Sequence, residues 1–221
     1  MHKTVQNLIN IQNLIKSKQS VLKNNEITPK IIAVSKTFKI NHILPLIEYG
    51  HTDYGENKVQ EAVEKWSQIK SNNNKIKLHL IGKLQTNKVK YCLPLFDYIH
   101  SLDSIKLADK IANEQVKKNF KPKIFLQINI GDEQQKSGID FKDAEELYAK
   151  IKNDFDLNII GLMCIPPNVS NTKPFFEKMN QISKKLNLNE LSMGMSNDYL
   201  DAAKNSATFV RIGSKIFGER N

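Results

Sequence analysis

Short apolar runs alternate with longer segments of helical periodicity along nearly the whole chain. The runs are rich in Val, Ile and Leu, as strands buried on both faces are. They lie near residues 31–35, 52–55, 77–82, 97–101, 123–130, 157–164, 190–195 and 208–212. Between them, apolar residues recur at spacings of three and four, which is typical of a helix with one buried face. A parallel sheet with a helix between successive strands has this pattern.

Eight strands that alternate with helices predict an α/β fold, a (β/α)8 barrel, and an open doubly wound sheet is the alternative. No Pro- or Gly-rich linker, charge block or change of composition divides the 221 residues. We therefore expect a single domain over residues 1–221. An amphipathic helix at about residues 2–23 is expected to open it, with an apolar stripe formed by Val5, Leu8, Ile11, Leu14 and Ile15.

The composition, with 40% hydrophobic and 25% charged residues, is that of an ordinary globular protein. No apolar run approaches the roughly 20 residues needed to cross a bilayer. Gln, Asn and Lys interrupt the first residues, where a secretory signal would be continuously apolar. We expect a cytoplasmic protein without membrane contact. Cys92 and Cys164 lie far apart in apolar stretches, which predicts buried thiols rather than a disulfide or a zinc site.

The net charge of +10 makes nucleic acid a partner to consider. Only two of the 33 basic residues, Arg211 and Arg220, are arginines, and the lysines are scattered among Asp and Glu. Proteins that read base edges rely on the flat guanidinium group. This composition therefore favours a solvated, lysine-rich surface over specific nucleic-acid binding.

Lys36 follows the first apolar run directly. Functional residues of such barrels lie at the carboxyl ends of the strands, so we expect this amine at the barrel mouth, partly removed from water. Desolvation lowers a lysine pKa and frees the amine to attack a carbonyl group. An ordinary surface lysine is the alternative, because the chain is so rich in lysine.

Two glycine motifs, SMGMS at residues 192–196 and RIGS at residues 211–214, end the last two predicted strands. Main-chain N–H groups near Gly and at a helix N-terminus approach phosphate closely, and barrel enzymes often bind phosphate at this place. Either motif alone is better explained as a simple turn, but the two together favour a phosphate site. Arg211 adds a permanently charged group beside it that is suited to a heterocycle or a carboxylate, with a surface salt bridge as the alternative.

Other chemistry has little support in the sequence. His79 lies among apolar residues and is expected to be a packing histidine with satisfied hydrogen bonds. No His-x-x-x-His motif, paired carboxylates or Ser-His-Asp arrangement stands out, which disfavours metal hydrolases and triad enzymes.

A lysine after the first strand, a phosphate site at the last two and an arginine beside it suggest a phosphorylated carbonyl cofactor such as pyridoxal 5′-phosphate. The sequence resembles the pyridoxal phosphate homeostasis protein family, which is related to the barrel domain of bacterial alanine racemase. The resemblance covers nearly the whole chain. It rests on the segments IIAVSKT, YGENKVQE, LHLIGKLQTNK, INIGDEQQKSGI, IIGLMCIPP, LSMGMSNDY and VRIGSKIFGER, in family order.

The resemblance implies a role for each candidate residue. Lys36 would form the internal aldimine. Ser196, Gly213 and Ser214 would hold the phosphate, with Met195 alongside. Arg211 would face the pyridine nitrogen, and Asn57 would lie beside the ring. No metal is expected.

The family likeness also implies a function, namely buffering of pyridoxal phosphate or its delivery to cofactor-dependent apoenzymes, with little or no turnover. A guanidinium at the ring nitrogen disfavours ring protonation, so carbanion stabilisation should be weak. The alternative is an amino-acid racemase or lyase, which would need a second base; the related racemase takes it from a tyrosine positioned with help from an added β domain. The chain ends soon after the last predicted strand, so we expect a barrel without that domain, and a monomer.

Overall fold

The computed structural model describes residues 1–21, 28–133 and 135–219. Their strands form one parallel sheet in the order β4-β3-β2-β1-β9-β8-β7-β5-β6, and β4 also pairs with β5. The strands are β1 (Lys30–Val34), β2 (Asp53–Glu56), β3 (Lys77–Leu80), β4 (Tyr98–Leu102), β5 (Lys123–Asn129), β6 (Ile139–Asp140), β7 (Asn158–Cys164), β8 (Glu190–Ser192) and β9 (Phe209–Ile212). The pairing of β4 with β5 closes the sheet, so the predicted eight-stranded barrel is confirmed and the open sheet is excluded.

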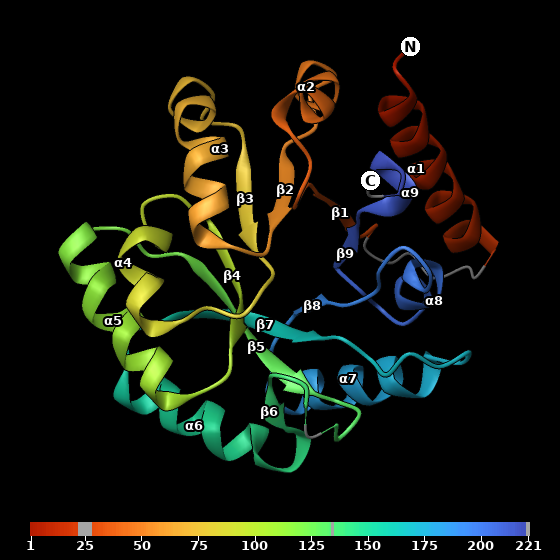
Figure 1. Cartoon of the computed structure of the whole chain (residues 1–221). Coiled ribbons are helices and arrows are strands. Elements are labelled where there is room, and N and C mark those ends of the chain that lie inside the picture. The colour runs from red at the N-terminus through yellow and green to blue at the C-terminus, as the bar shows by residue number, and fades with distance from the viewer. Residues whose placement is uncertain (22–27, 134, 220–221) are drawn as a thin grey trace.

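Helices surround the barrel (Figure 1). They are α1 (Lys3–Val21), α2 (Ile40–Glu48), α3 (Val59–Asn72), α4 (Val89–Cys92), α5 (Ile105–Lys118), α6 (Ala144–Asp154), α7 (Lys173–Lys185), α8 (Tyr199–Lys204) and α9 (Ser214–Phe217), with 3-10 turns η1 (Thr86–Lys88) and η2 (Phe141–Asp143). Within the described part of the chain, none of these helices is both long and apolar enough to span a bilayer.

The sequence predictions fail at three places in the sheet and its connections. The run at 190–195 was expected to be one strand, but β8 ends at Ser192 because Gly194 turns the chain with a φ of 89°. The two-residue strand β6 is too short to leave a periodic pattern. Helix α9, a single turn directly after β9, was expected to be tail.

Helix α1 lies beside α8 and α9, so the start of the chain packs on its last elements (Figure 1). Val5, Leu8, Ile11 and Ile15 are buried as predicted. Leu14 is 45% exposed, so its place in the stripe was wrong: at 100° per residue it lies off the line of the buried side chains. The predicted helix positions 22–23 lie outside the described residues.

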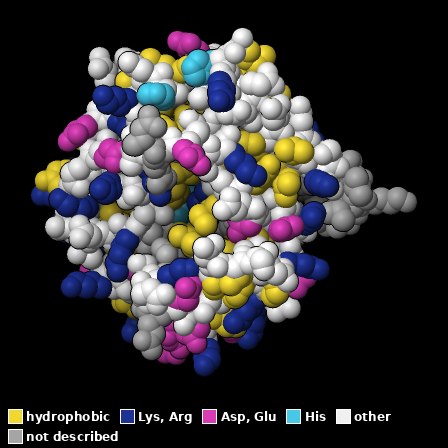
Figure 2. Space-filling view, turned by 45° about the vertical axis from the view of Figure 1, so that its right-hand side comes forward, with side chains coloured by type: hydrophobic (Ala, Val, Ile, Leu, Met, Phe, Trp, Pro, Cys, Tyr) yellow, Lys and Arg dark blue, Asp and Glu magenta, His cyan; other side chains and the backbone are white. Residues whose placement is uncertain are grey.

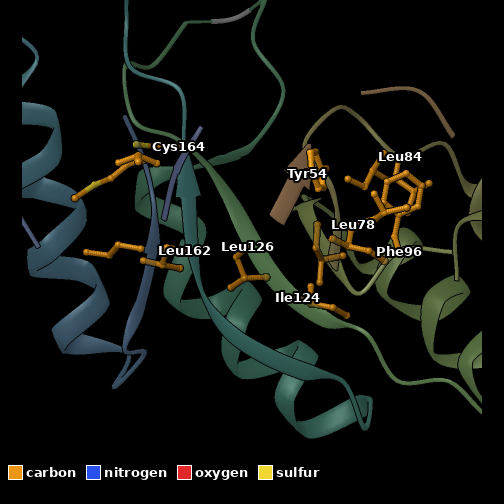
Figure 3. Packing of buried hydrophobic residues seen from close by; sticks show 14 of the residues in the cluster. Tyr54, Leu78, Leu84, Phe96, Ile124, Leu126, Leu162 and Cys164 are labelled. Atoms are coloured by element: carbon orange, nitrogen blue, oxygen red, sulfur yellow. The ribbon is translucent and has the colours of Figure 1, made fainter. Parts of the chain in front are cut away.

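The apolar core has two layers because successive side chains of a strand point to opposite faces. Outward side chains such as Leu126 and Leu162 pack under the helices (Figure 3). Inside the barrel lies a smaller cluster of Ile32, Tyr98, Phe125, Met163 and Phe209. Cys92 and Cys164 are buried free thiols, as predicted. The lysines are spread among acidic side chains over the face in Figure 2 rather than gathered into one patch.

Candidate functional site

A cleft of about 1000 Å³ opens at the carboxyl end of the barrel. All seven candidate binding residues line it, namely Lys36, Asn57, Met195, Ser196, Arg211, Gly213 and Ser214. They come from β2, β1, β9 and β8 or the loops after them, and these four strands are consecutive neighbours in the sheet. Residues up to 178 positions apart in the sequence thus share one cavity because β1 pairs with β9.

Lys36 lies on a tight turn after β1. Thr37, which follows it, has a φ of 69°, a left-handed conformation that β-branched residues rarely adopt. Two hydrogen bonds hold the turn: the Thr37 N–H donates to Glu61 Oε1 at 2.7 Å, and the Phe38 N–H donates to the Ser35 carbonyl at 3.1 Å. Strained backbone of this kind persists only where its surroundings enforce it, and it is common at functional sites.

The buried carboxylate of Glu56 supports the same turn from the outer face of β2. Its Oε1 accepts hydrogen bonds from Ser35 Oγ at 2.7 Å, from Trp66 Nε1 at 2.9 Å and from Lys65 Nζ at 3.0 Å. Lys65 Nζ also donates to the Ser35 carbonyl at 3.0 Å. One carboxylate therefore ties the residue before Lys36 to two side chains of α3.

We expect Glu56→Gln to lower the free energy of unfolding by about 1–3 kcal/mol, because the ammonium of Lys65 loses the buried one of its two carboxylate partners and keeps only Glu61. Glu64→Gln on the same helix is the matched control, since Glu64 is exposed and its change should stay within about 0.5 kcal/mol. Urea denaturation of both variants measures the difference. Equal midpoints for the two variants would show that the buried network does not support the turn.

Arg211 is only 4% exposed and crosses the barrel interior below the cleft. Its Nη1 donates to the Ser192 carbonyl at 2.6 Å and to Ser192 Oγ at 2.7 Å, and its Nη2 donates to the Cys164 carbonyl at 2.7 Å. These bonds fix the plane of the guanidinium group. Burial lowers the pKa of Arg211, but an arginine pKa is so high that the group stays charged. The surface salt bridge considered from the sequence is therefore excluded.

The loops after β8 and β9 form the opposite wall of the cleft. The Met195 N–H donates to Asp198 Oδ1 at 2.6 Å, which shapes the loop that carries Ser196. Helix α9 begins at Ser214, directly after Gly213. The first N–H groups of a helix have no acceptor four residues back, so they remain able to bind an oxyanion.

Asn57 carries a buried polar atom that lacks a partner. Its Oδ1 is removed from solvent, and no hydrogen-bond partner is found for it among the described residues. A buried acceptor without a partner costs stability unless a ligand or a water satisfies it. With the amine of Lys36, the guanidinium of Arg211 and the hydroxyls of Ser196 and Ser214, the cleft offers the donors and acceptors that a phosphorylated heterocyclic aldehyde requires.

One wall of the cleft was not predicted from the sequence. Residues 165–170, which follow β7, line it together with Thr172 and Lys136. The adjacent Pro166 and Pro167 were the available sign that an ordered loop, and not a helix, follows this strand. The packing role predicted for His79 is confirmed, since the ring is buried and both of its nitrogens have partners.

Comparison with known proteins identifies the family. Residues 7–221 match the model of the alanine racemase N-terminal domain. The pyridoxal phosphate homeostasis protein of Haemophilus influenzae is 39% identical over 97% of this chain and 95% of its own length. The human protein of that name is 36% identical over 88% of this chain and 78% of its own. The chain belongs to the pyridoxal phosphate homeostasis protein family.

Solved structures agree with this family assignment. PipY of Synechococcus elongatus PCC7942, solved without pyridoxal phosphate, superposes with a TM-score of 0.82 at 31% identity, over 92% of this chain and 100% of that one. The structure of PipY with pyridoxal phosphate bound gives 0.79 at 30% identity, with the same coverage. An alanine racemase of Clostridium difficile shares the fold at a TM-score of 0.74 and 16% identity, and the match covers 99% of this chain but 57% of the racemase.

Proposed function

We propose that this protein binds pyridoxal 5′-phosphate in the cleft and serves to buffer the cofactor or deliver it to apoenzymes that need it. The observation that carries the proposal is the placement of Lys36 and Arg211 in one cleft with the loops after β8 and β9. A relative of 30% identity with the cofactor bound supports it. When bound, the group would supply an aldehyde that joins a lysine amine through a C=N bond with loss of one water.

Each cleft residue has a role in this proposal. Lys36 would hold the cofactor covalently, since the enforced turn fixes where its amine can reach. Ser196, Gly213 and Ser214 would bind the phosphate through hydroxyl and N–H groups, with Met195 against it. Arg211 would donate to the ring nitrogen, and Asn57, whose Oδ1 lacks a partner, would lie beside the ring.

The proposal includes little or no catalytic turnover. A permanently charged donor at the ring nitrogen opposes ring protonation, which weakens the cofactor as an electron sink. We also propose that the chain acts as one cofactor-binding domain and as a monomer. The likeness to alanine racemase is a likeness of fold, so it does not by itself favour amino-acid racemisation.

The absorption spectrum of the purified full-length protein tests the proposal. We expect a visible band that borohydride removes while it fixes the mass of the cofactor on Lys36, as read by peptide mass mapping. Incubation with a cofactor-free, pyridoxal phosphate-dependent enzyme should restore that enzyme's activity. A colourless protein that retains no cofactor contradicts the proposal, and rapid loss of optical purity of any amino acid would replace it with a racemase.

A further inference from the structure

A continuous chain of hydrogen bonds runs through the barrel interior and ends on Arg211. Asp53 Oδ1 lies 3.0 Å from His79 Nε2, and His79 Nδ1 lies 3.0 Å from His100 Nε2. His100 Nδ1 lies 2.9 Å from Ser192 Oγ, which accepts from Arg211 Nη1 at 2.7 Å. Asp53 is the first residue of β2, whereas Arg211 lies near the carboxyl end of β9, so the chain spans the barrel lengthwise.

The two ends fix the direction of every bond between them. An arginine only donates hydrogen bonds, and an ionised aspartate only accepts them. A neutral imidazole has one donor and one acceptor nitrogen. His79 must therefore donate from Nε2 and accept at Nδ1, and His100 must do the same. Ser192 then accepts from Arg211 and donates its own proton to His100.

This order requires neutral rings at His79 and His100 and an ionised carboxylate at Asp53, and the environment of each group favours that state. Burial lowers the pKa of His79 although Asp53 opposes it, and burial with His79 and Arg211 nearby holds the pKa of His100 well below its usual value. Burial raises the pKa of Asp53, but hydrogen bonds from His79 and Thr52 outweigh it and keep the pKa low. Both rings are thus neutral and the carboxylate is ionised at neutral pH.

Packing leaves the rings little freedom to turn. His79 stacks on Tyr98 with ring centroids 4.2 Å apart, and His100 stacks on Phe125 at 4.3 Å. Among the described residues, no carboxylate lies within ion-pair distance of Arg211, although the guanidinium group is buried. Within the described residues, the hydrogen-bonded chain links Arg211 to the anion Asp53 through the serine and the two imidazoles, whereas burial lowers the pKa of Arg211 and Asp198 raises it from a distance.

We propose that Asp53, His79, His100 and Ser192 form a one-way relay that holds Arg211 as a fixed cationic donor at the cleft, with both histidines in the Nε2–H form. They are positioning residues, since only Arg211 borders the cleft. The relay rests on the proposed function only for the identity of the ligand that Arg211 faces. Its direction is a property of the protein without ligand.

Nuclear magnetic resonance of the ligand-free, full-length protein with 15N-labelled histidine tests the direction. We expect His79 and His100 to give the neutral Nε2–H pattern throughout a titration from about pH 8 to about pH 6. Ser192→Ala should keep His100 in this form, because its Nε2 still donates to His79, but the Nδ1 resonance of His100 should shift, because Nδ1 loses its donor. A wild-type ring in the Nδ1–H form, or one doubly protonated near pH 7, overturns the relay.

The same variant tests the effect on the ligand. Ser192→Ala keeps the hydrogen bond from Arg211 Nη1 to the main-chain carbonyl at this position, so the fold should persist. The dissociation constant for pyridoxal phosphate should rise roughly fivefold. The 15N resonance of a labelled cofactor ring should shift. His51→Gln is the matched control: His51 bonds the Asp53 carbonyl outside the relay, and its loss should change neither value.

The outcomes separate this relay from the proposed function. If the wild-type protein fails to bind pyridoxal phosphate, the proposed function fails, while the histidine forms still decide the relay. If the cofactor binds and Ser192→Ala leaves both its affinity and its ring resonance unchanged, the chain of bonds is structural only and the positioning role is wrong.

Discussion

Lys36→Ala is expected to abolish covalent attachment of pyridoxal phosphate completely. The visible absorption band should disappear, and borohydride should no longer fix any cofactor mass on the protein. Weaker, reversible binding should remain, because the Ser196 and Ser214 loops and Arg211 are unchanged. Covalent attachment should be lost because Glu56 and Glu61 hold the turn that carries Lys36, so no neighbouring amine takes the place of the Lys36 amine.

Lys39→Ala is the control for this substitution. Lys39 is an exposed lysine three residues further on, and its replacement should leave the band intact. Absorption spectra and the mass of intact, borohydride-treated protein give the comparison. Continued attachment in Lys36→Ala, for example on Lys136 in the same cleft, would show that the amine was assigned wrongly.

Gly194→Ala is expected to lower the free energy of unfolding by at least about 2 kcal/mol and to weaken cofactor binding. Gly194 has a φ of 89°, and a Cβ there would lie 2.4 Å from the Cβ of Ala202 in α8. The overlap must push α8 or the loop before it, and that loop carries Met195 and Ser196 of the cleft.

Gly50→Ala separates the cost of a left-handed backbone conformation from the cost of the overlap with Ala202. Gly50 has a similar φ of 95°, but a Cβ there meets nothing within 4 Å. It should show only the cost of the left-handed backbone, about 1 kcal/mol, with cofactor affinity unchanged. Urea denaturation and binding titrations measure both variants. Equal destabilisation by the two substitutions would mean that the loop after β8 yields freely and does not depend on this close approach.

The barrel and most of its mouth could be predicted because both depend on patterns local in sequence. Buried strands leave apolar runs, and the first polar residue after a run, such as Lys36, marks its carboxyl end. Leu14 was misplaced for a different reason: it lies at the margin of the apolar face of α1, and periodicity does not show how far neighbouring elements cover that margin. The loop after β7 carries no periodicity, so its place in the cleft depends on tertiary packing alone.

The relay was beyond the reach of sequence reasoning. His79 was expected to be a satisfied packing residue, and it is one, but its partners come from β2 and β4, and His100 in turn meets Ser192 of β8. A histidine with an inward-facing polar neighbour on another strand looks the same in sequence as one packed among apolar residues. Only the register of the closed sheet brings these side chains into line.

The pairing of β1 with β9 has a consequence for how the protein is made. Ile32 lies opposite Arg211 in this pairing. Strand β1 is synthesised first and β9 last, so the barrel cannot close before β9 has been synthesised. Helix α1 likewise lacks its packing partners α8 and α9 until they have been synthesised. Until then the growing polypeptide contains Lys36 but not Arg211, so it lacks part of the site proposed to bind pyridoxal phosphate. The complete cleft can therefore form only after β9 and α9 have been synthesised.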